Sequence, residues 1–239
     1  MKKRIYLLLL SIVVIFFSCR DDSGKFEEQL FTNEQITFAL KECVRITSDS
    51  TLYVLCVVDS PMGYYYFDSK AYRIELQAAT KQVVDTLRAH DFGDVIDSLI
   101  FNLNKAAELC GNKMKSLFWT PLIKEITFPE PYKILHGGNN AITNYVKSTK
   151  QSELLLLLKT NILLEQFNAL KLFSTWNMLQ EEYYTITGNY ISIDILDPAA
   201  QQMMDGFFKM MAILEEAVRK NPELGGDKKG WLYRVFATM

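Results

Sequence analysis

Apolar residues recur every three or four positions through most of this chain, and this period limits what the chain can fold into. The clearest stretch is 94–110, where Ile96, Leu99, Leu103 and Cys110 fall on one stripe. Such a stripe is typical of an amphipathic helix that buries one face. The pattern predicts an all-α protein, a single bundle or array of about seven to nine helices, behind a lipoprotein signal peptide.

The same period, read together with capping residues, predicts the positions of the other helices. The last long helix is expected to start with Asp197 as its N-cap and Pro198 as its first residue. Gly111 is expected to end the helix of 94–110. Residues 52–58 are rich in β-branched side chains and are compatible with a strand, although we favour a continuation of the first helix. Helices are expected at 33–58, 77–90, 94–110, 113–126, 128–136, from about 140, and at 152–179, 197–221 and 231–236.

The N-terminal residues form a targeting segment. Residues 2–4 are basic, and residues 6–17 form an apolar run that is too short to span a bilayer. Ser18 and Cys19 resemble a lipobox, in which a signal peptidase cleaves before a cysteine that carries acyl chains such as palmitate. Phe16 stands where leucine is usual, so an ordinary signal peptide with an incidental Cys19 is the alternative. The expected division is a signal peptide at 1–18, the lipidated cysteine and a tether at 19–32, and a helical domain at 33–239.

This segment implies a lipid-anchored protein of the bacterial cell envelope. The outer membrane is the expected site, either on its periplasmic side or at the cell surface. Residues 20–25 are polar, as a flexible tether would be. The acidic pair Asp21 and Asp22 resembles export signals of some surface lipoproteins, but it is equally compatible with a merely solvated tether.

The net charge argues against nucleic acid as a partner, and the histidine and cysteine content argues against a metal site. Cleavage after residue 18 removes three of the 26 basic residues, so 23 remain against 28 acidic ones, a formal charge of −5. An acidic chain without a basic cluster does not suit nucleic acid. Two histidines and no CxxC motif provide no metal site, and no cofactor is expected. Cys43, Cys56 and Cys110 allow one disulfide at most, although we favour buried thiols.

Several polar and glycine residues are candidates for a binding site. Asn104 and Glu108 are four apart and share a helix face, where they form either a buried clasp between helices, which we favour, or a ligand site. His136 and Gly137 precede a helix start near residue 140, so they either hold an anion there or only cap two helices. Gly206 in mid-helix indicates a close approach by another helix or a ligand.

The candidate region also carries the motifs of a known family. Thr127 and Glu130 have the spacing of a capping box. The chain resembles the envelope proteins catalogued as domain of unknown function 4197 over about residues 33–237. The matching motifs are Asn104-Lys-Ala-Ala-Glu108, Ile126-Thr-Phe128, Ile134-Leu-His-Gly137, Ala141 with Thr143 and Tyr145, Asp205-Gly-Phe-Phe208, Glu215-Glu216 and Arg219-Lys-Asn-Pro222. The chain departs from the family at 73–76 and at the 225–230 loop.

The resemblance implies a mostly helical envelope protein and supplies no activity. We expect a non-enzymatic lipoprotein that contacts the membrane through its lipid and binds a partner protein or an apolar ligand. The alternative is an enzyme of unknown class with Glu108 as acid or base, although no catalytic set is recognisable. The candidate ligand-binding residues are Asn104, Glu108, Thr127, His136, Gly137, Tyr145, Asp205 and Gly206.

Overall fold

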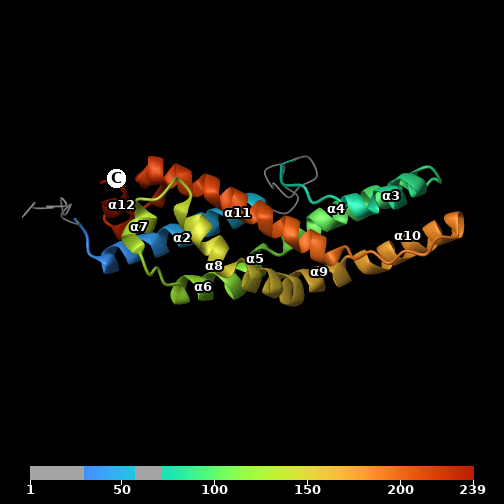
Figure 1. The fold of residues 1–239 in the computed structure, drawn as a ribbon, viewed down its shortest axis with the longest axis horizontal. Helices are drawn as coiled ribbons and strands as arrows, with labels where there is room; N and C mark the ends of the chain where they lie inside the picture. The colour runs from blue at the N-terminus through green and yellow to red at the C-terminus, as the bar shows by residue number, and fades with distance from the viewer. Residues whose placement is uncertain (1–29, 57–70) are drawn as a thin grey trace, which may run out of the picture. The chain divides into compact units, whose positions relative to one another are not determined.

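The computed structural model describes residues 30–56 and 71–239, and residues 33–239 form one compact unit. Every regular element in these ranges is helical, so the all-α class is confirmed (Figure 1). The expected signal peptide, Cys19, most of the tether and residues 57–58 lie outside the described residues. No helix in the described ranges has the length and apolarity needed to cross a membrane.

The helices follow one another with few long connections. In chain order they are α2 (Asn33–Leu55), η2 (Ala78–Thr80), α3 (Lys81–Arg88), α4 (Gly93–Leu109), α5 (Gly111–Met114), the π-helical η3 (Lys115–Trp119), α6 (Thr120–Glu125), α7 (Pro131–Leu135), α8 (Ala141–Leu157), the π-helical η4 (Leu158–Leu163), α9 (Leu164–Ala169), α10 (Leu172–Thr187), α11 (Leu196–Lys220), η5 (Pro222–Gly225) and α12 (Trp231–Phe236).

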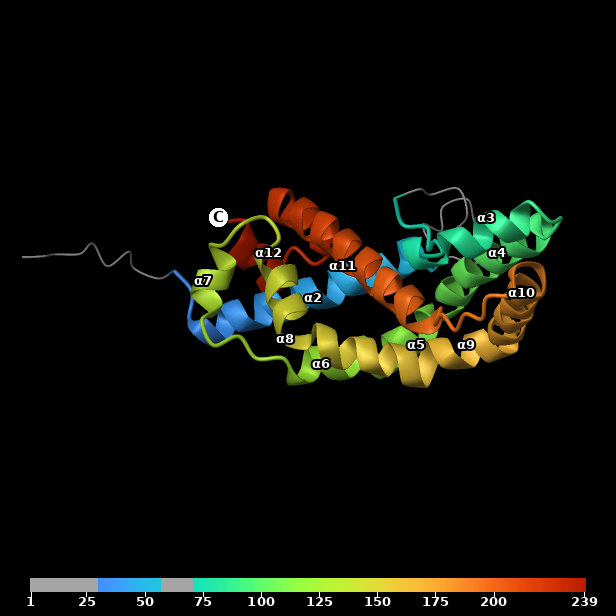
Figure 2. The same cartoon turned by 45° about the vertical axis from the view of Figure 1, so that its right-hand side comes forward.

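Two groups of helices form the core. The long helices α2 and α11 pack on each other, with α12 against α2 and α8 against α11 (Figure 2). Trp119 of η3 also packs on α11: its ring stacks on Phe207 with 4.6 Å between centroids, and both side chains are buried. In the second group α3, α4 and α10 contact one another, and α9 joins α4 and α10. The helices packed against α2 and α11 therefore cover the buried stripes of both, as their periodicity requires.

Two predicted helix ends are wrong in the middle of the chain. The helix expected at 128–136 begins only at Pro131, so the capping box at Thr127 does not form. The fixed φ of proline suits a first helical residue, which explains the later start. Gly111 does not end a helix either, because it is the first residue of α5.

Two more boundaries differ further along. The helix expected at 152–179 is broken at Lys171, whose φ of 57° is left-handed, and α10 then continues to Thr187. A left-handed lysine carries no sequence signal, because glycine or asparagine usually takes that conformation. The last long helix begins at Leu196, and its N-terminal amides are capped by Asp194, which accepts from Leu196 and Asp197 at 3.0 Å each.

Candidate functional site

A pocket of about 350 Å³ lies where the end of α2 meets the end of α4 and the start of α5. Helix periodicity places Glu108 and Leu109 at the last turn of α4, beside the last two turns of α2. The volume of the pocket is within the range of small-molecule sites. The side chains that line it are apolar at Leu52, Tyr53 and Leu109, charged at Asp49, Glu108 and Lys115, and otherwise Cys56, Gly111 and Asn112.

The charged groups of this pocket differ in burial. Glu108 is only 3% exposed, whereas the side chains of Asp49 and Lys115 are 28% and 57% exposed. Lys115 Nζ lies 3.0 Å from Asp49, and Arg45 lies 3.6 Å from the same carboxylate. The pocket therefore combines a buried acid with an ion pair at its solvent side.

Cys56 and Gly111 bring the two helices close together at this pocket. A Cβ added to Gly111 would lie 2.6 Å from the Cβ of Cys56, closer than two carbons can come. Burial raises the pKa of the Cys56 thiol well above its usual value, and Cys110 and Glu108 nearby raise it further. The thiol is therefore protonated at neutral pH and is not an activated nucleophile. Cys43, Cys56 and Cys110 are all free thiols.

Replacing Gly111 with alanine is expected to lower the free energy of unfolding by about 1–3 kcal/mol, because the new methyl group overpacks the contact with Cys56. Urea denaturation followed by circular dichroism measures this change. Gly138→Ala is the control, since nothing lies within 4 Å of a Cβ there. Adding Cys56→Gly to Gly111→Ala should recover stability, and an unchanged urea midpoint for Gly111→Ala alone would contradict the close contact.

Asn104 serves a different part of the structure. Its side chain is 2% exposed and pairs with the backbone of Ile74: Oδ1 accepts from the Ile74 amide at 2.8 Å, and Nδ2 donates to the Ile74 carbonyl at 2.9 Å. Nδ2 also donates to the Ile100 carbonyl at 2.8 Å. Asn104 therefore holds the extended segment 73–77 on α4, and it does not line the pocket of Glu108.

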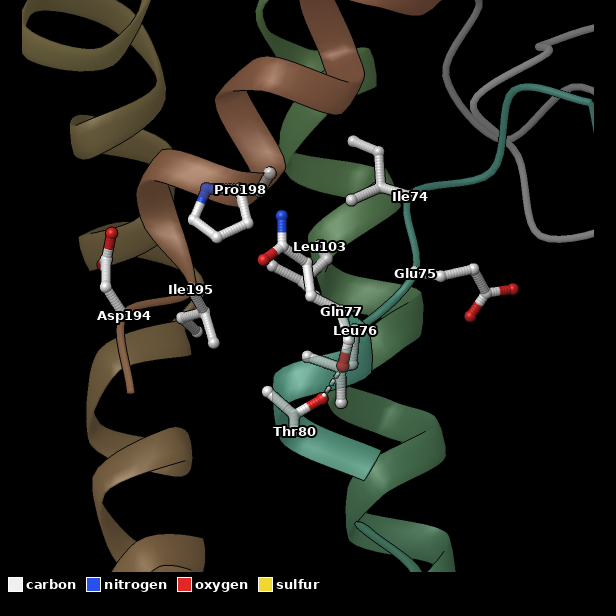
Figure 3. A pocket seen from close by; sticks show the side chains of 10 residues that line it. Ile74, Glu75, Leu76, Gln77, Thr80, Leu103, Asp194, Ile195 and Pro198 are labelled. Carbon is white, nitrogen blue, oxygen red and sulfur yellow. Dashed lines mark hydrogen bonds between the residues drawn. The ribbon is translucent and has the colours of Figure 1, made fainter. Parts of the chain in front are cut away.

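A second amide holds the same segment from α11. Gln202 Oε1 accepts from the Glu75 amide at 3.0 Å, and its Nε2 donates to the Glu75 carbonyl at 2.9 Å. Consecutive residues of an extended chain point their backbone groups in opposite directions, so the two clamps act from two sides. Figure 3 shows the cavity between this segment, Leu103 and Pro198. Its volume of about 10 Å³ suits a single water, so it is no ligand site.

The buried pair Glu215 and Arg219 ties four helices together. Glu215 is 1% exposed and accepts from the amides of Ile142 and Thr143, at 3.0 and 2.7 Å, at the start of α8. Arg219 Nε donates to Glu215 at 2.8 Å, and its Nη1 donates to the Leu135 carbonyl of α7 at 2.6 Å. The guanidinium also lies over the Phe236 ring of α12, 5.5 Å from its centroid. These contacts are structural, because every one of them is to another part of the fold.

This pair bears on the anion site considered for His136 and Gly137. The helix start that follows them does hold an anion, namely the carboxylate of Glu215. His136 itself is exposed and lies 4.3 Å from the Tyr132 ring. A Cβ on Gly137 would meet that of Ala141 at 2.6 Å. The negative charge at this turn therefore comes from α11 of the chain itself.

The remaining candidates lie elsewhere. The Tyr145 hydroxyl donates to the carbonyl of Thr127 at 2.8 Å, so these two residues meet. Asp205 is exposed on α11 and lies 3.3 Å from Lys147 Nζ. Gly206 is buried in α11. The eight candidates therefore divide among several places, and Glu108 alone lines the 350 Å³ pocket.

Other residues of these sites were not identified from the sequence. Asp49 and Lys115 carry no motif, and Glu215 and Arg219 were noted only as parts of family motifs. Within 30–56 and 71–239, no group of three or more His, Cys, Asp and Glu residues lies together as a metal site needs. No curated protein and no solved structure matches the chain. The family model for proteins of unknown function DUF4197 matches residues 31–237, and the chain therefore belongs to that family.

Proposed function

We propose that this chain is a lipid-anchored protein of the bacterial cell envelope whose helical domain binds a small ligand and catalyses no reaction. The anchor is Cys19, with the basic and apolar segment before it as the export signal. The outer membrane is the proposed location. Membrane attachment through lipid suits the acidic charge of the processed chain, which gives no electrostatic attraction to anionic lipid.

The 350 Å³ pocket beside Glu108 carries the binding part of this proposal. It combines an apolar wall with a few charged groups, which is the usual composition of a ligand site. The buried polar residues Asn104 and Glu215 lie outside this pocket and hold backbone segments. Two other pockets, of about 320 and 330 Å³, are lined by Gln77 and its neighbours, but neither contains a buried carboxylate.

A second candidate function is an enzyme with Glu108 as acid or base. It is favoured by one observation, namely that Asp49 and Lys115 line the same pocket as this buried carboxylate. Against it, Asn104 pairs with Ile74 instead of facing the pocket, and the Cys56 thiol is protonated. Catalysis would also need a group that activates a substrate, and the residues that line the pocket form no recognisable catalytic set.

Native mass spectrometry of the full-length protein, purified from its own membranes, tests the binding role. We expect a bound small molecule that Leu109→Arg removes, because the long cation enters the pocket. Leu156→Arg is the matched control, since Leu156 is an exposed leucine on α8 that does not line the pocket. Circular dichroism establishes that both variants are folded. Retention of the molecule by Leu109→Arg would contradict this location.

A further inference from the structure

We draw no further inference here: the strongest candidate, a pocket of about 330 Å³ between the segment 73–77, α3 and α4 that is lined by the cations of Arg73, Lys81 and Arg88, carries no anion site because each of these cations already pairs with a carboxylate of the chain itself.

Discussion

Replacing Arg219 with methionine is expected to lower the free energy of unfolding by about 3–5 kcal/mol, the usual cost of removing one partner of a buried ion pair. Glu215 would remain 1% exposed with its charge, and two amides of α8 would be its only remaining donors. The Leu135 carbonyl would lose its donor as well. Since natural domains are stable by roughly 5–15 kcal/mol, this is a large share of the total.

Urea denaturation followed by circular dichroism measures the loss, and the neighbouring residue provides the control. Lys220 pairs with Glu216, but both side chains are exposed, so Lys220→Met should lower the stability far less than Arg219→Met does. Adding Glu215→Gln to Arg219→Met removes the uncompensated charge and should recover part of the stability. If the double variant is no more stable than Arg219→Met, the buried charge is not the cause.

The positions of the helices can be predicted from the sequence far better than the residues at which they begin and end. The stripe through 94–110 predicted α4, because a helix with a wide apolar face has few other ways to bury it. The break at Lys171 could not be predicted, since left-handed backbone at lysine is imposed by the packing around it. Gly111 was expected to end a helix, and instead it allows the end of α2 to approach closely. A single sequence cannot distinguish these two roles of a glycine.

The candidate site could be predicted only in part, because residues that are far apart in the sequence form it. Periodicity indicated that Glu108 is partly buried, but part of the lining of its pocket comes from α2, more than fifty positions earlier. An anion or simple capping was considered for the turn after His136, and the carboxylate found there is Glu215, which lies 73 residues beyond Ile142. The spacing of residues within a helix predicts which face of that helix each one lies on. Contacts between helices that are distant in sequence depend on how the whole chain packs.

The structure also separates buried polar residues by what they touch. Asn104 and Glu108 share a helix face in sequence, yet Asn104 pairs with the backbone of Ile74 and Glu108 lines a pocket. A single motif thus places one residue against an extended backbone segment and the other beside a pocket.

Replacing Asn104 with leucine is expected to lower the free energy of unfolding by about 2–4 kcal/mol. Leucine has nearly the same shape, but it leaves the amide and the carbonyl of Ile74 buried without their partner, at about 1–3 kcal/mol for each unsatisfied group. Urea denaturation gives the overall loss. Hydrogen exchange of the Ile74 amide measures the local loss of stability, and this amide should exchange faster than in the unaltered protein.

Gln202 offers a control with the same chemistry and a different environment. It makes the same pair of hydrogen bonds to Glu75 that Asn104 makes to Ile74, but Glu75 is exposed whereas Ile74 is fully buried. After Gln202→Leu water can take the place of the lost amide, so the cost should be about 1 kcal/mol or less. Equal losses for the two variants would mean that burial does not set the strength of these clamps. A larger loss for Asn104→Leu would identify the α4 clamp as the one that fixes the segment 73–77.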